Sequence, residues 1–118
     1  MVQSNDNVAV SKKIYSYLGL AQKAGTLVAG EFLTEKAIQE KKAELILVSE
    51  EASANTRKKF IDSATYYDVP IYLIGSKEEL GHCIGKEFRA SVAILDTGFA
   101  TAIMKQLAFL EHEDQRRR

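Results

Sequence analysis

The residues best suited to chemistry lie between Gly25 and Lys36, in the stretch GTLVAGEFLTEK. The pattern predicts that one helix ends at Gly25, in a left-handed position that favours glycine, and that a second helix begins at Gly30. The first N–H groups of a helix lack internal partners and carry the positive end of its dipole, so a phosphate can bind there. Lys36, within the second helix, has a side chain long enough to reach the same region. The alternative is that the two glycines only mark turns around a short strand.

A nucleotide-binding P-loop is the competing phosphate motif. The spacing from Gly25 to Gly30 matches the outer glycines of that motif. A P-loop then requires Lys followed by Ser or Thr, which contact the phosphates and the magnesium ion. Glu31 and Phe32 stand at those two positions, so the sequence excludes this chemistry.

The sequence offers no suitable set of residues for a metal site or for acid–base catalysis. His82 and Cys83 are adjacent in a predicted short helix and face different ways, and the other histidine, His112, lies near the end of the chain. No four-ligand metal set follows from this spacing, and Cys83 is expected to be a half-buried residue rather than a catalytic thiol. We therefore expect no catalytic residue, metal or cofactor. Three aspartates are interpreted as a helix-surface residue, a turn residue and a helix cap: Asp62, Asp68 and Asp96.

Composition indicates one domain, spanning residues 1–118, with a substantial core. Of the 118 residues, 46% are apolar, and no repeat or linker interrupts them. The 16 basic and 16 acidic residues cancel, which excludes a strongly basic nucleic-acid coat but permits a small RNA site built from a few placed cations. A single cysteine, a polar N-terminus without a secretory pattern and the absence of a membrane-length apolar run predict a cytoplasmic protein.

Helical and strand patterns alternate along the chain. The continuous apolar run Leu45–Val48 predicts a strand covered on both faces. The alternation predicts a layered α/β fold with helices on both faces of one sheet. Residues 1–10 and 111–118 are expected to be flexible ends. Helices are predicted over 12–24, 31–41, 54–67, from Ser76 to about Ile84, and from a cap at Asp96 or Thr97; strands are predicted over 26–28, 45–48, 71–74 and 90–95.

Three segments together resemble a known family. They are 25–30 followed by Lys36-Ala37, then 42–48, and then 79–81 with 85–92. The chain resembles the ribosomal-protein L-seven-Ae/L-thirty-e family of small RNA-binding proteins over roughly residues 12–107. The third segment looks most like the L-thirty-e branch, and the overall pattern is similar to bacterial YlxQ-type members.

This resemblance implies a fold, a function and a set of contact residues. The fold is a three-layer α/β/α sandwich with one small mixed sheet. The function is non-enzymatic binding of the kink-turn, a sharply bent internal loop in RNA, by a ribosomal or ribosome-associated protein. Ribosomal RNA and ribosomal proteins are the implied partners, and a monomer or weak dimer is expected. By matching position, the contacts fall on the start of the second helix and the loop before the last core strand: Gly30, Glu31, Phe32, Leu33, Lys36, Lys86, Phe88, Arg89, Ala90 and Ser91.

The sequence departs from the family pattern at Phe32 and Leu33. Many kink-turn binders carry Asn-Glu at these positions and read guanine edges with them. Neither Phe nor Leu can form a side-chain hydrogen bond, although Phe32 can stack on an exposed base. This departure predicts weaker affinity for a standard kink-turn or a different RNA, and it keeps open a protein-interaction module on the same fold.

Two further segments give predictions that a structure can test. Phe88 lies outside the predicted strand and helix stripes, so it is either a lid over the sheet edge or an exposed platform for a base. The basic run Arg57-Lys58-Lys59 is predicted to lie on a solvated helix face.

Overall fold

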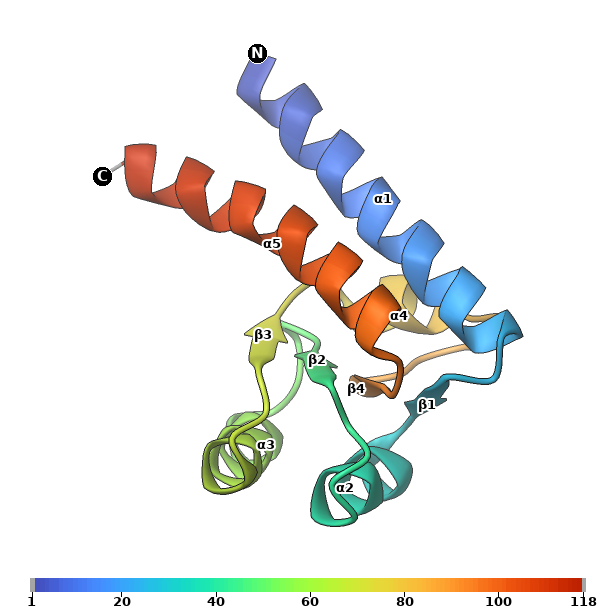
Figure 1. Cartoon of the computed structure of the whole chain (residues 1–118). Coiled ribbons are helices and arrows are strands. Elements are labelled where there is room, and N and C mark those ends of the chain that lie inside the picture. The colour runs from blue at the N-terminus through green and yellow to red at the C-terminus, as the bar shows by residue number, and fades with distance from the viewer. Residues whose placement is uncertain (1, 118) are drawn as a thin grey trace.

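The computed structural model describes the backbone of residues 2–117 and the side chains of residues 8–110. Helices and strands alternate along this chain (Figure 1). The helices are α1 (Val2–Lys23), α2 (Glu31–Gln39), α3 (Ala54–Tyr67), α4 (Lys77–Cys83) and α5 (Thr97–Arg117). The strands are β1 (Leu27–Ala29), β2 (Leu45–Val48), β3 (Ile71–Leu73) and β4 (Ser91–Ile94).

The four strands form one mixed sheet in the order β1-β4-β2-β3. Strand β4 is antiparallel to both β1 and β2, whereas β2 and β3 are parallel. Strands β1, β2 and β3 therefore run in the same direction, and their C-terminal ends meet at the edge of the sheet where β4 begins. Helices α2, α3 and α4 follow these three strands, so their N-termini gather at that edge, which we call the helix-start edge.

Helices cover both faces of the sheet. Alternate residues of β2 divide between the faces, because successive side chains of a strand point in opposite directions. Leu45 and Leu47 pack with α1, α4 and α5, whereas Ile46 and Val48 pack with the inner sides of α2 and α3. Figure 1 shows α1 and α5 above the sheet and α2 and α3 below it. The predicted three-layer α/β/α sandwich with a small mixed sheet is confirmed.

The helix ends follow the predicted local chemistry. Ser53 accepts a hydrogen bond from the third residue of α3, and Ser76 and Glu79 form a reciprocal capping box on α4. The carboxylate of Asp96 accepts the N–H of Phe99 at 2.9 Å, so Asp96 is the cap of α5. Gly25 has a φ of 75°, which confirms the left-handed end predicted for α1.

The two ends of the chain differ from prediction. Helix α1 begins at Val2 rather than after Ser11, so the loose lead-in expected over residues 1–10 is wrong for residues 2–10. Residues 2–18 contain no glycine or proline to interrupt a helix. The start of α1 was nevertheless not predicted, because these residues form only a weak apolar stripe. Helix α5 likewise continues to Arg117, through most of the segment predicted as a loose tail. None of the helices in the described chain is long and apolar enough to cross a bilayer.

Candidate nucleic-acid interface

The helix-start edge brings together the two segments predicted to form one surface. The N–H of Gly30 donates to the carbonyl of Ser91 at 2.9 Å, joining the start of α2 to the start of β4. The hydroxyl of Ser91 donates to the hydroxyl of Thr34 at 3.3 Å, and both residues are fully buried. This contact follows from the sheet, because β1 and β4 pair so that Ala29 lies opposite Val92.

Helix α2 begins with open space in front of its first turn. Gly30 occupies the N-cap position with φ 96° and makes no side-chain capping bond. A Cβ atom added at Gly30 would meet no other atom within 4 Å. Gly30 is therefore required by its backbone conformation rather than by packing. The uncapped N–H groups behind it can be reached by a ligand.

The exposed side chains of the first turn of α2 are mostly apolar. Phe32 is 75% exposed and Leu33 is 45% exposed, whereas Thr34 turns inward to Ser91. Lys36 is exposed one turn further along the same helix. Together these positions form an apolar surface beside a cation and free backbone donors.

The loop between α4 and β4 supplies the second half of the surface. Phe88 is 64% exposed, so the ring projects into solvent and does not form a lid over the sheet edge. Lys86 is exposed, and the half-buried Arg89 donates from its guanidinium to the carbonyl of Phe88 at 2.7 Å. Ala90 is half-buried, and Ser91 turns its side chain into the core. Within this loop, Lys86, Glu87 and Phe88 are therefore the exposed side chains, and Arg89 is half-buried.

Close contact with α4 holds this loop in place. The N–H of Lys86 donates to Gly81 at 2.8 Å, and the N–H of Arg89 donates to Lys77 at 3.0 Å. A Cβ atom at Gly81 would lie 2.5 Å from the carbonyl carbon of Glu87, so only glycine fits this approach. The sequence did not predict this close approach, because Gly81 looks like any glycine inside a short helix.

The basic run of α3 is not a uniformly solvated face. Lys59 pairs with Glu31 of α2 at 3.0 Å, and Arg57 is half-buried. Lys58 is exposed as predicted and pairs with Asp62 at 2.7 Å, which raises the pKa of Lys58. The prediction is therefore wrong for Arg57, whereas Lys59 is exposed as predicted and also forms an ion pair because α3 lies beside α2.

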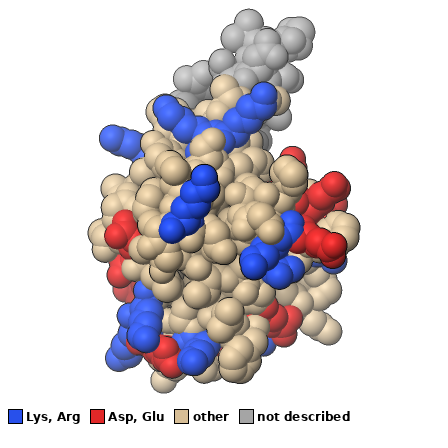
Figure 2. Space-filling view, turned by 90° about the vertical axis from the view of Figure 1, so that its right-hand side faces the viewer, with Lys and Arg blue, Asp and Glu red and all other residues tan. Residues whose placement is uncertain are grey.

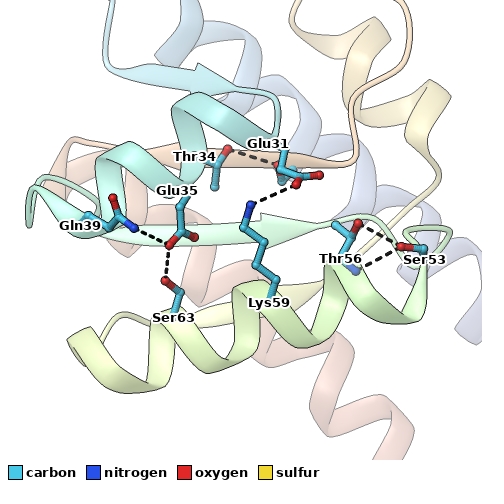
Figure 3. A network of polar contacts seen from close by, with 9 residues as sticks. Glu31, Thr34, Glu35, Gln39, Ser53, Thr56, Lys59 and Ser63 are labelled. Carbon is cyan, nitrogen blue, oxygen red and sulfur yellow. Dashed lines mark hydrogen bonds and ion pairs between the residues drawn. The ribbon is translucent and has the colours of Figure 1, made fainter.

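Lys59 belongs to a polar seam between the two helices (Figure 3). Ser63, one turn after Lys59, donates to Glu35 at 2.7 Å, and Gln39 donates to the same carboxylate at 3.0 Å. Glu31 and Glu35 are one turn apart on α2, and Lys59 and Ser63 are one turn apart on α3. This matched four-residue spacing is the signal in the sequence from which the seam could have been found.

Charge divides along the helix-start edge. Figure 2 shows basic side chains spread over the face that includes β1 and the C-terminal end of α1, with acidic ones mainly toward its sides. Acidic residues predominate after β2 and β3 at the other half of the edge, with Lys77 as a basic exception, and they disfavour a polyanion there: Glu50, Glu51, Glu78 and Glu79. The basic residues Lys36, Lys86 and Arg89 lie on the β1 and β4 half, along with two acidic exceptions, Glu31 and Glu87.

A groove of about 1010 Å³ between α1, α4, α5 and β3 contains none of the predicted contact residues. Cys83 lies in its wall, and its thiol donates to the carbonyl of Leu80 at 3.2 Å. Burial, with a further contribution from Glu79, raises the pKa of Cys83 to about 11. Burial and Glu79 also raise the pKa of Tyr15. Cys83 is half-buried, as predicted. No cluster of metal-binding side chains occurs among the residues described.

Comparison with known sequences gives a consistent family. Residues 12–104 match the Ribosomal protein L7Ae/L30e/S12e/Gadd45 family. The chain is 44% identical over 93 residues to the RNA-binding protein YlxQ of Bacillus subtilis, covering 79% of this chain and 93% of that protein. It is 42% identical over 89 residues to the YlxQ protein of Enterococcus faecium, covering 75% and 85%. It is 35% identical over 102 residues to the large ribosomal subunit protein eL30 of Neurospora crassa, covering 81% and 90%.

Solved structures show the same architecture. A protein of unknown function from Bacillus halodurans C superposes with a TM-score of 0.79 at 33% identity, covering 81% of this chain and 97% of that one. The 15.5kD RNA binding protein of Giardia lamblia superposes with a TM-score of 0.75 at 17% identity, covering 89% and 90%, and this likeness concerns the fold alone. From the match over residues 12–104 and the identities of 42–44% to the two YlxQ proteins, this chain belongs to the Ribosomal protein L7Ae/L30e/S12e/Gadd45 family.

Proposed function

We propose that this chain is a non-enzymatic, cytoplasmic RNA-binding protein that recognises structured RNA of the kink-turn kind as a ribosomal or ribosome-associated component. Its relatives include two proteins named as RNA-binding and one named as a large ribosomal subunit protein. The proposed contact surface consists of the start of α2 with Lys36 and the loop Lys86–Ala90.

The hydrogen bond from Gly30 to Ser91 is the observation that carries this proposal. It places the uncapped start of α2 beside the loop that presents Phe88. Backbone N–H groups and exposed lysines bind phosphates, and an exposed aromatic ring stacks on a base that has left the helical stack. A sharply bent RNA offers unstacked bases and crowded phosphates in one place, whereas a straight duplex hides its bases. The surface is therefore suited to bent RNA.

Binding to a synthetic kink-turn RNA, compared with a straight duplex of equal length, tests the proposal. We expect tighter binding of the kinked RNA. Replacing Lys36 with Ala should weaken all RNA targets and lower the salt slope by roughly one unit, because one phosphate contact is lost. Lys105, exposed on α5 in the opposite helical layer, is the matched control. Equal losses for Lys36→Ala and Lys105→Ala would show diffuse electrostatic binding and contradict the site.

The exposed apolar pair Phe32 and Leu33 favours a second candidate function, a protein-interaction module. Large apolar side chains exposed side by side are typical of surfaces that bind other proteins. The test is whether the purified protein retains cellular RNA and whether it self-associates in size-exclusion chromatography. Retention of kink-bearing RNA by a monomer supports the first function. Self-association without RNA, abolished by Phe32→Ser, supports the second.

A further inference from the structure

Strand β3 lies at one margin of the sheet, and among the described residues no strand pairs with its outer edge (Figure 1). On its inner side, the carbonyl of Pro70 and the N–H of Ile74 each bond to β2 at 2.9 Å. Successive backbone groups of a strand point in opposite directions, so Ile71 and Leu73 turn their N–H and C=O groups away from β2. The described chain supplies no hydrogen-bond partner for these groups. The outer edge of β3 is therefore free to pair with another strand.

The groove between α1, α4, α5 and β3 runs along this free edge. All three residues of β3 line it. Its volume of about 1010 Å³ is at the upper end of the roughly 300–1,000 Å³ typical of ligand sites, which is room for several residues of an extended chain. Apolar and aromatic side chains from α1, β3 and α5 contribute to its lining: Val8, Tyr72, Leu107 and Leu110.

The groove is acidic at the end where β3 finishes. Glu50 and Glu51 follow β2, Glu79 lies in the first turn of α4, and all three are exposed in the lining. Lys12 is the one ammonium among the described lining residues. The ion pairs found between residues 8 and 110 involve none of these three glutamates. Their charge repels nucleic acid and attracts a cation.

We propose that this groove is a docking site for an extended, cationic segment of a partner protein, which adds to β3 as a further strand and places a Lys or Arg side chain beside the three glutamates. Main-chain hydrogen bonds to Ile71 and Leu73 hold the segment, and its alternate side chains determine which sequence fits. The short length of β3 and the preceding Pro70 limit pairing with a whole sheet, whereas a peptide needs only these few bonds. None of the lining residues belongs to the proposed RNA surface, so this inference does not depend on RNA binding.

A synthetic peptide in which valine and lysine alternate is the probe, and the same peptide with glutamate in place of lysine is its control. Fluorescence anisotropy without RNA should show roughly tenfold tighter binding of the lysine peptide, because its charge complements the groove. Methylating the backbone N–H groups of alternate residues blocks one edge of the peptide. Each edge belongs to one face, and the apolar groove favours the valine face. One of the two possible methylated peptides should therefore lose binding while the other retains it, and equal affinities would overturn the pairing with β3.

Variants of the protein test the charge and the edge separately. Glu50→Lys should weaken binding of the lysine peptide roughly fivefold, because attraction becomes repulsion. Glu78→Lys is the matched control, since Glu78 is exposed at the same end of α4 but does not line the groove. Leu73→Pro removes an outward N–H without removing a bond to β2, so it should abolish binding. Leu73→Ala keeps that N–H and should weaken binding by no more than about threefold, since the side chain is 41% exposed.

The outcomes distinguish a peptide site from other uses of the groove. Thermal melting identifies any variant that fails to fold, and if Leu73→Pro does so, the methylated peptides decide. Equal binding of the lysine and glutamate peptides, or equal losses in Glu50→Lys and Glu78→Lys, would show diffuse contact and overturn the proposal. Self-association of the protein that Leu73→Pro abolishes, without peptide binding, would assign the edge to a second copy and also overturn it.

Discussion

Replacing Phe88 with Ala separates a ligand-binding ring from a structural one. The side chain is 64% exposed, so folding buries roughly a third of it. Full burial of a phenylalanine contributes about 1.5–3 kcal/mol to stability. Phe88→Ala should therefore lower the free energy of unfolding by only ~0.5–1 kcal/mol.

The effect on RNA binding should be larger than the effect on folding. Stacking of a base on an aromatic side chain is worth ~1–3 kcal/mol, which corresponds to a roughly 5- to 150-fold change in Kd. The loss should be greatest for bent RNA, because a straight duplex of equal charge offers no unstacked base. The preference for bent over straight RNA should fall by about the same factor.

The assay pairs thermal melting with RNA affinity on both RNAs. Phe109 provides the matched control, because it is 59% exposed but lies on α5, in the other helical layer. Phe109→Ala should change stability by a similar amount and leave RNA preference intact.

A result in which Phe88→Ala melts much lower while preserving the preference for bent RNA would refute the platform interpretation. A variant that matches Phe109→Ala in every measurement would place the loop outside the binding surface.

Three further predictions concern glycines and the thiol. Gly81→Ala should displace the loop that carries Phe88, lowering stability by ~1–3 kcal/mol and weakening RNA binding; unchanged binding with lowered stability would uncouple the loop from the site. Gly30→Val should abolish RNA binding and lower the free energy of unfolding by ~1–3 kcal/mol through its φ of 96°, and retained binding would contradict the open helix start. At pH 8, iodoacetamide should modify Cys83 about a hundredfold more slowly in the folded than in the unfolded protein, because burial raises the pKa from 9.0 to about 11 and only the thiolate reacts. The folded rate should keep rising toward pH 11, and equal rates in both states at pH 8 would contradict the shift.

Local patterns predicted the elements that local chemistry determines. Helix α3 occupies residues 54–67 in both prediction and structure, because Ser53 caps its start and Phe60 and Ala64 give it a buried stripe. The fully apolar run of β2 identified a central strand, since both faces of that strand are covered. These features depend on neighbours close in sequence or on burial alone, so a single chain is enough to reveal them.

Features that depend on the approach of distant segments were missed or misjudged. The ion pair of Lys59 with Glu31 was missed because nothing near Lys59 in sequence indicates that Glu31 faces it. Gly81 resembled an ordinary helical glycine because the carbonyl of Glu87 that excludes a Cβ atom comes from a returning loop. Both residues take part in contacts between different elements, and the periodicity of apolar residues does not indicate which elements become neighbours.

The candidate surface also depends on a contact between distant segments, the start of α2 and the loop before β4. The sheet holds these two segments together. The pairing of Ala29 with Val92 fixes where Gly30 meets Ser91, and the buried hydroxyls of Thr34 and Ser91 meet just behind that point. A shift of β4 by one residue would turn its buried side chains to the opposite face, so the register is strongly specified. The distance between the start of α2 and the loop with Phe88 is consequently set by the core rather than by either loop. Substitutions of Leu27 in β1 or of the buried residues of β4 should therefore alter RNA preference without touching RNA. Insertions at the opposite ends of these strands should leave that preference unchanged.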